Sequence, residues 1–166
     1  MESLKLSSDS PEQTQLLGQY LGELAQQGDV FLLVGELGTG KTCLVQGIAR
    51  GLHVKEYAFS PSFVILRQYY GRLPLYHIDF YRLDRIEEIA DLGLEEYFLG
   101  DGVCVVEWAN KGVHILPHHS LLITIDYVPA VETGRYIRLR PQSTRYRELV
   151  EQLKTRGVLA TMAAKC

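Results

Sequence analysis

The sequence predicts a three-layer α/β protein, in which helices flank a central mixed, mainly parallel β-sheet. One observation is the order strand, glycine-rich turn, helix: an apolar run at residues 30–34 precedes the glycines, and helically spaced apolar residues follow them. Another is the apolar run at residues 103–106, a pattern typical of a strand buried in a parallel sheet. The third is size. A chain of 166 residues, 46% of them hydrophobic, suits a single domain spanning residues 1–166.

Residues 35–42 read GELGTGKT, which matches the whole phosphate-binding pattern G-x-x-x-x-G-K-[ST]. Its glycines allow backbone conformations that turn the N–H groups inward as an anion-binding nest. We expect Lys41 to reach the β- and γ-phosphates of a nucleoside triphosphate and the Thr42 hydroxyl to ligate Mg²⁺. The sequence thus predicts a P-loop NTPase-like fold. The predicted nucleotide contacts are Gly35, Glu36, Leu37, Gly38, Thr39, Gly40, Lys41, Thr42 and Cys43.

Helix signals surround this loop. Ser10 is a predicted N-cap that forms a capping box with Gln13, and the apolar face that follows predicts a helix ending at Gly28. After the loop, residues 41–50 have helical spacing, and Gly51 is expected to cap that helix. Near the C-terminus, residues 144–154 predict a surface helix, and about residues 156–166 are expected to be flexible.

The middle of the chain is richer in strand signals. Residues 63–70 and 75–80 predict a hairpin, and two further strands are expected at 121–127 and 136–140, around a turn at Gly134. Between them we expect a short helix at residues 84–91, then a turn at 94–99. On a strand, His77 and Asp79 share one face, which brings two polar side chains together.

Charge and cysteine content restrict the class of protein. The net charge of −3 gives no overall basic field that would draw the chain onto DNA or RNA. Three separated cysteines, Cys43, Cys104 and Cys166, argue against a disulfide framework or a zinc site and suit a reducing cytoplasm. No signal peptide and no membrane-spanning run is expected.

Two carboxylates are candidates for the chemistry. Glu107 follows a buried apolar strand, as expected of an acid that faces a bound metal. For Asp79, spacing alone does not separate a functional role from a structural one. His77 and Asp79 form an alternative transition-metal pair, which is disfavoured because no third ligand stands at a clear spacing. For the adenine and ribose, Thr14, Lys111 and Arg135 are weak candidates, and plain helix packing is the alternative for Thr14.

A series of motifs then resembles a known family. GELGTGKT, SPSF at 60–63, YHIDFYRL at 76–83, LGLEEYF at 92–98 and VVEW at 105–108 occur in the order typical of the bacterial TsaE family, formerly YjeE. The resemblance covers nearly the whole chain, from about residue 10 to about residue 140. Two departures are visible: Ser62 and Cys43 stand where the family commonly has threonine. A thiol at a helix N-terminus is expected to have a lowered pKa, although a merely tolerated small residue is the alternative at position 43.

The resemblance implies an Mg²⁺-dependent ATPase. It would serve the threonylcarbamoyl modification of adenosine 37 in tRNAs that read codons starting with A, acting with a TsaB–TsaD complex and meeting tRNA only through that complex. It implies that Thr42 and Glu107 ligate Mg²⁺, that Asp79 is essential for hydrolysis, and that Lys41 acts on the phosphates. Arg82 is the nearest internal candidate for an arginine finger, or else a partner contact.

Three other functions are alternatives for a chain with this loop. A GTPase is rejected, because Val113 stands where the guanine-binding N-K-x-D motif needs its aspartate. A small-molecule kinase and a nucleotide-sensing module without real turnover both remain open. Neither an arginine-rich lid nor an acceptor pocket for a kinase can be identified in the sequence.

Overall fold

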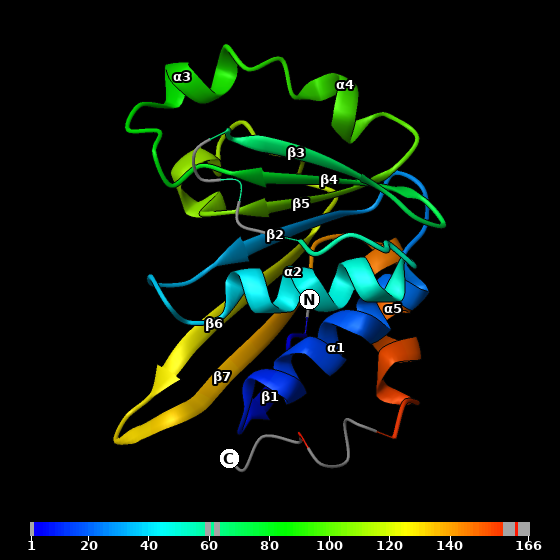
Figure 1. Cartoon of the computed structure of the whole chain (residues 1–166), viewed down its shortest axis with the longest axis vertical. Helices are drawn as coiled ribbons and strands as arrows, with labels where there is room; N and C mark the ends of the chain where they lie inside the picture. Colours follow the sequence, from blue (N-terminus) through cyan, green and yellow to red (C-terminus); the bar gives the residue numbers. More distant parts are fainter. Residues whose placement is uncertain (1, 59–60, 62–63, 158–161, 163–166) are drawn as a thin grey trace.

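The computed structural model describes residues 2–58, 61, 64–157 and 162. Within these residues, a seven-stranded sheet is packed against helices (Figure 1). The elements, in chain order, are β1 (Leu4–Ser8), α1 (Pro11–Leu24), β2 (Val30–Val34), α2 (Lys41–Gly51), β3 (Leu66–Tyr70), β4 (Pro74–Asp79), α3 (Ile86–Ala90), α4 (Glu95–Phe98), β5 (Val103–Glu107), the 3₁₀ helix η1 (Ala109–Gly112), β6 (Leu121–Val128), β7 (Val131–Pro141) and α5 (Thr144–Lys154).

The sheet has the order β1-β7-β6-β2-β5-β4-β3. Its four central strands, β6, β2, β5 and β4, are parallel to one another. At the edges, β7 is antiparallel to β6, β1 is antiparallel to β7, and β3 is antiparallel to β4. The predicted fold class, a central mixed and mainly parallel sheet flanked by helices, is confirmed. This topology brings the carboxyl ends of β2, β4 and β5 to one edge, where ligands bind in open α/β sheets.

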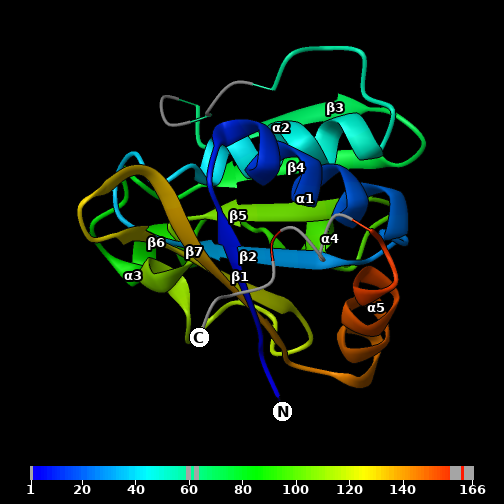
Figure 2. The same cartoon turned by 90° about the horizontal axis from the view of Figure 1, so that it is seen from below.

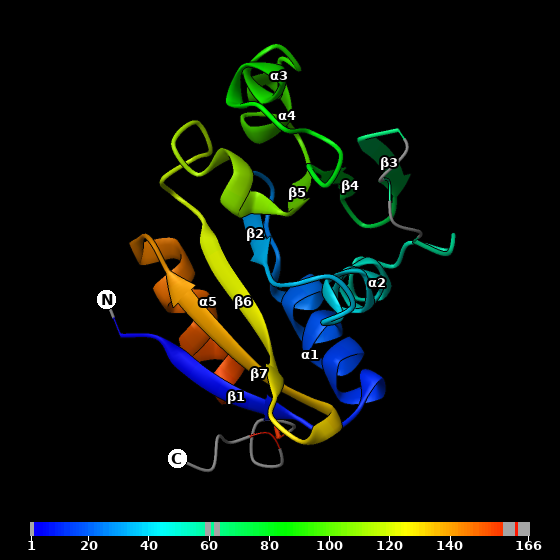
Figure 3. The same ribbon diagram turned by 90° about the vertical axis from the view of Figure 1, so that its left-hand side faces the viewer.

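Alternate side chains of each central strand build two cores. Phe31 and Leu33 belong to a core shared with α1, α2 and α5, while Val30 and Leu32 belong to a second core shared with α3 and the residues around α4. Figures 2 and 3 show the same layering, with α1 and α2 along one face of the sheet and the short α3 and α4 beyond β4 and β5.

Helices α1 and α2 approach unusually closely, and glycines make this possible. A Cβ atom on Gly47 would lie 2.0 Å from the Gln15 carbonyl oxygen, and one on Gly18 would lie 2.3 Å from that of Leu44. Gly22 and Gly51 repeat the arrangement one turn further along. Because Lys41 and Thr42 begin α2, this contact also fixes the position of the end of the helix that carries them.

We therefore predict that Gly47→Ala lowers the free energy of unfolding by about 1–3 kcal/mol, since the added methyl group meets backbone rather than a movable side chain. Gly157→Ala is the matched control, because a Cβ there meets nothing within 4 Å. Urea denaturation of the three proteins checks this. Equal midpoints for the wild type and Gly47→Ala would show that the helices can separate at little cost.

Two helix ends differ from the predictions. Helix α1 ends at Leu24 rather than at Gly28, which instead adopts a left-handed turn (φ +88°) before β2. Gly51 is the last helical residue rather than the cap; its role is the close contact with Gln19 of α1. The predicted Ser10 cap is confirmed, since its hydroxyl accepts from the Gln13 N–H.

Several strand boundaries also differ. Strand β3 begins at Leu66 rather than at residue 63, because Ile65 has a left-handed backbone (φ +69°). The turn between β6 and β7 lies at Ala130 (φ +62°), so Gly134 lies inside the longer β7 and the predicted turn there is wrong. Strand β1 was not predicted, and the expected turn at 94–99 contains helix α4.

Some predictions lie outside the described residues. Three of the four residues of the SPSF motif, Ser60, Ser62 and Phe63, fall there, as does most of the C-terminal stretch predicted to be flexible, residues 158–161 and 163–166. In the part that the structure describes, no helix combines the length and apolar character needed to cross a membrane.

Candidate functional site

The glycine-rich loop between β2 and α2 has the backbone that its sequence predicts. Gly38 (φ +80°) and Gly40 (φ +108°) are left-handed, and Gly40 is the residue from which α2 starts. A Cβ on Gly35 would lie 2.5 Å from the Ile125 carbonyl oxygen of β6. The Thr39 hydroxyl donates to the Glu36 carbonyl at 2.9 Å. The loop is thus a tight turn that opens directly into the amino end of a helix, where anions are stabilised.

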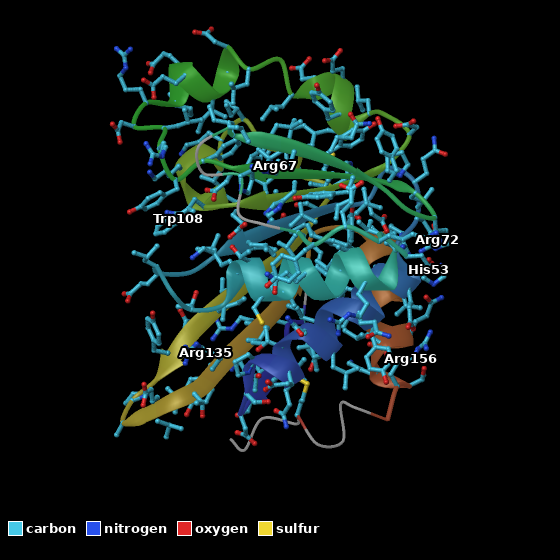
Figure 4. The ribbon with its side chains drawn as sticks, viewed as in Figure 1. His53, Arg67, Arg72, Trp108, Arg135 and Arg156 are labelled. Carbon is cyan, nitrogen blue, oxygen red and sulfur yellow. The ribbon has the colours of Figure 1, made fainter. Side chains whose placement is uncertain are left out.

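The hairpin of β6 and β7 holds this loop from outside. Arg135 Nε donates to the Thr39 carbonyl oxygen at 2.8 Å, and the Tyr127 hydroxyl donates to that of Leu37. The Arg135 guanidinium also lies over the Tyr127 ring, 4.7 Å from its centroid. Figure 4 shows Arg135 on one side of the loop and Trp108 on the other. Because these bonds are accepted by backbone carbonyl oxygens, the loop N–H groups are not involved in them.

Lys41, 5% exposed, lies at the centre of the site. Its Nζ donates to the carbonyl oxygens of Gly35 (2.6 Å) and Glu36 (2.7 Å) and lies 4.4 Å from the centroid of the Trp108 ring. Burial lowers the pKa of this ammonium group, while the charges of Glu107 and Asp79 act in the opposite direction. The lysine is therefore held over the loop, close to both acids.

Asp79 and Glu107 end two neighbouring parallel strands and are partners in the register of β4 and β5. Each is only 2% exposed. The Thr42 hydroxyl donates to the Glu107 carboxylate, 3.0 Å from Oε1 and 3.2 Å from Oε2. Asp79 Oδ1 accepts from the Tyr81 N–H at 2.8 Å. The sequence-predicted residues Lys41, Thr42, Asp79 and Glu107 are thus brought together.

This set of oxygen donors suits Mg²⁺. Thr42 and Glu107 offer one hydroxyl and one carboxylate, and Mg²⁺ is commonly held by one or two such groups together with waters and substrate phosphates. Among the described residues, no group of three or more His, Cys, Asp and Glu side chains could hold a metal by itself.

Two adjoining cavities meet at Gly38, Gly40 and Cys43. The first has a volume of about 240 Å³. Its lining includes Lys41, Thr42, Asp79 and Glu107, together with Leu37, Tyr81 and Trp108. The second, about 290 Å³, lies between the start of α1 and β7 and includes Thr14, Thr39 and Arg135 in its lining. The first cavity thus contains the residues predicted to bind phosphate and metal, and the second contains two of the predicted candidates for the adenine and ribose, Thr14 and Arg135.

The remaining predicted residues are placed less directly. Lys111 is not among the described residues that line either cavity; its Nζ donates to the carbonyls of Tyr81 and Leu83. Glu36 acts through its backbone carbonyl, while its side chain is exposed. For Cys43 the expected pKa direction is wrong, because burial, aided by Glu12, raises the thiol pKa.

Sequence reasoning missed Tyr127 and the contact of His77 with Glu107, whose Nε2 and Oε2 are 2.5 Å apart. For the contact of His77 with Glu107, the only available signal was the spacing of His77 and Asp79, which places both on one face of a strand. Neither contact has a signature in a single segment, since each joins residues 30 or 90 positions apart.

The chain is similar to known proteins over most of its length. A family model described as "Threonylcarbamoyl adenosine biosynthesis protein TsaE" matches residues 8–136. Two proteins named tRNA threonylcarbamoyladenosine biosynthesis protein TsaE are similar. That of Bacillus subtilis is 42% identical over 92% of this chain and 95% of its own length, and that of Treponema pallidum is 41% identical over 74% and 90%.

A solved structure supports the same grouping. The crystal structure of Bacillus subtilis YdiB superposes with a TM-score of 0.80 at 37% identity, covering 92% of this chain and 95% of that one. Sequence and fold therefore agree over nearly the whole length of both proteins. The chain belongs to the TsaE family.

Proposed function

We propose that this protein is an Mg²⁺-dependent ATPase required for the threonylcarbamoyl modification of adenosine 37 in tRNAs that read codons starting with A. The observation that carries the proposal is the meeting of Lys41, Thr42, Asp79 and Glu107 in one cavity, at the carboxyl ends of β4 and β5. The pathway is inferred from its similarity to proteins named tRNA threonylcarbamoyladenosine biosynthesis protein TsaE. Hydrolysis would drive repeated turnover of a TsaB–TsaD complex rather than the transfer itself.

Each residue has a role in this proposal. Lys41 and the loop N–H groups bind the β- and γ-phosphates, and Thr42 and Glu107 hold Mg²⁺, which neutralises charge on the phosphates when bound. Asp79, buried beside Glu107, acts on the γ-phosphate side by positioning the attacking water. All four side chains are fixed by strand ends and a helix start, as positioning catalysis requires.

The second cavity suits the adenosine end of the nucleotide. Thr14 and Arg135 line it, and both were candidates for this part. The Thr14 hydroxyl is 2.8 Å from that of Ser8, which fixes its orientation. Arg135 binds the loop carbonyls, so a nucleoside resting against it would also stabilise the loop.

The proposal places the protein in the cytoplasm, with TsaB and TsaD as partners and without a role for membrane or DNA. With a net charge of −3, contact with tRNA is assigned to the complex rather than to this chain alone.

A small-molecule kinase and a nucleotide sensor without turnover are the alternatives. Incubation with Mg–ATP and a mixture of metabolites tests them, with products followed by mass spectrometry and released phosphate by a colorimetric assay. ADP and free phosphate support an ATPase, a phosphorylated metabolite supports a kinase, and no product supports a sensor.

Trp108 provides an optical report on the site. It is the single tryptophan of the chain. The centroid of its ring lies 4.4 Å from Lys41 Nζ and 5.2 Å from the centroid of the Tyr81 ring. We predict that Mg–ATP changes its fluorescence, because Lys41 must turn toward the phosphates, and that ADP produces a different change. Titration of the wild type against each nucleotide measures both. An unchanged spectrum at saturation would show that Trp108 only packs.

A further inference from the structure

His77 lies in the core behind the proposed metal ligands. Its side chain is fully buried, and Nε2 is 2.5 Å from Oε2 of Glu107. In the register of β4 and β5, His77 is opposite Val105, so its ring reaches one pleat along the same sheet face to Glu107. The contact is therefore fixed by two neighbouring strands of the central sheet.

The Glu107 carboxylate is consequently held from two sides. His77 contacts Oε2 from within the core, while the Thr42 hydroxyl contacts both carboxylate oxygens from α2. With these two contacts the carboxylate has little freedom to rotate. Such outer contacts commonly orient a metal-binding carboxylate, and their loss typically costs 10–100-fold in metal affinity.

The other ring nitrogen argues against a role in packing alone. Nδ1 of His77 is buried and has no hydrogen-bond partner among the described residues. Burying an unpaired polar atom destabilises the folded state, a cost that an apolar side chain of similar size would avoid. A neutral imidazole with its proton on Nε2 leaves only a bare lone pair at Nδ1 and gives Glu107 a charge-assisted hydrogen bond.

We propose that His77 is a positioning residue: its Nε2–H donates to Glu107 and turns the carboxylate toward Thr42 and the Mg²⁺ of bound nucleotide. This inference rests on the proposed function and adds a residue to it. His77 does not touch the nucleotide cavity, being absent from the described residues that line it. Its effect must therefore pass through Glu107.

The test measures ATP affinity by calorimetry with Mg²⁺ and with EDTA. Mg²⁺ is expected to increase the ATP affinity of the wild type, and His77→Leu is expected to reduce that increase by about 10-fold or more. The ATP affinity of His77→Leu in EDTA should equal that of the wild type. His77→Gln is expected to recover most of the Mg²⁺-dependent increase, because its amide can donate to Glu107. In a Glu107→Ala background, His77→Leu is expected to have no further effect. His119→Leu, at an exposed position, is the matched control.

A normal Mg²⁺-dependent gain in His77→Leu would overturn the proposal, as would an equal loss in EDTA, which would indicate a structural role. If His77→Leu does not fold, nitrogen NMR of the wild-type histidines decides. We expect an Nε2-protonated His77 whose signal shifts with Mg–ADP but not with ADP in EDTA. An Nδ1 proton, or no difference, overturns the inference. Absence of ATP binding by the wild type would instead overturn the proposed function and, with it, this role.

Discussion

Lys41→Ala is expected to weaken ATP binding by about 100-fold or more. The variant loses the charged donor for the β- and γ-phosphates, and hydrogen bonds from a charged group contribute about 1.5–3 kcal/mol each. It also removes the bonds from Nζ to the carbonyls of Gly35 and Glu36, so the loop loses a support. Calorimetric titration with Mg–ATP measures the effect.

Lys111→Ala is the matched control for that experiment. Lys111 Nζ also lies near Trp108, 5.7 Å from the ring centroid, but it does not belong to the described lining of the cavity. Its removal is expected to change ATP affinity by less than about 3-fold. Near wild-type affinity in Lys41→Ala would contradict the assignment of the loop as the phosphate site.

Asp79→Ala is expected to separate binding from hydrolysis. Without the carboxylate that positions water, turnover should fall by about 100-fold or more, whereas much of the nucleotide affinity should remain, because Lys41 and the loop are unchanged. Released phosphate measures the first quantity and calorimetry the second. Normal hydrolysis by this variant would show that the strand-end aspartate has no part in the reaction.

Glu107→Ala provides the contrasting variant at the neighbouring strand end. Its carboxylate contacts Thr42 rather than Tyr81, so its loss should abolish the Mg²⁺ dependence of binding. The two variants remove acids that are register partners, equally buried, and differ in what they contact. A matching loss of Mg²⁺ dependence in both would indicate that the acids share one role.

The parts of the fold set by local sequence were predictable. The left-handed conformations at Gly38 and Gly40 follow from the motif, because the loop closes only where residues without a Cβ stand. The shared face of His77 and Asp79 follows from the period of a strand. The assembly of Lys41 with the two acids also depends on the order of the strands in the sheet, which was not predicted and is seen only in the structure.

The rest depends on contacts between distant segments. Strand β1 pairs with β7, which lies more than a hundred residues later in the sequence. Its five residues carry no turn signal of their own. Ala130 adopts a turn conformation that alanine does not favour, so Gly134 was the more plausible turn on local grounds. Tyr127 and Arg135 reach the loop only because β6 and β7 extend beyond it.

The measurement that tests the central claim most directly is the steady-state ATPase rate of the pure protein against that of the protein reconstituted with TsaB and TsaD, in matched salt. Lys41, Thr42, Asp79 and Glu107 form the site, while an arginine for the developing charge can be supplied by a partner. The account predicts a weak rate alone and strong stimulation by the complex, with Asp79→Ala inactive in both. An equal rate with and without the complex would contradict it.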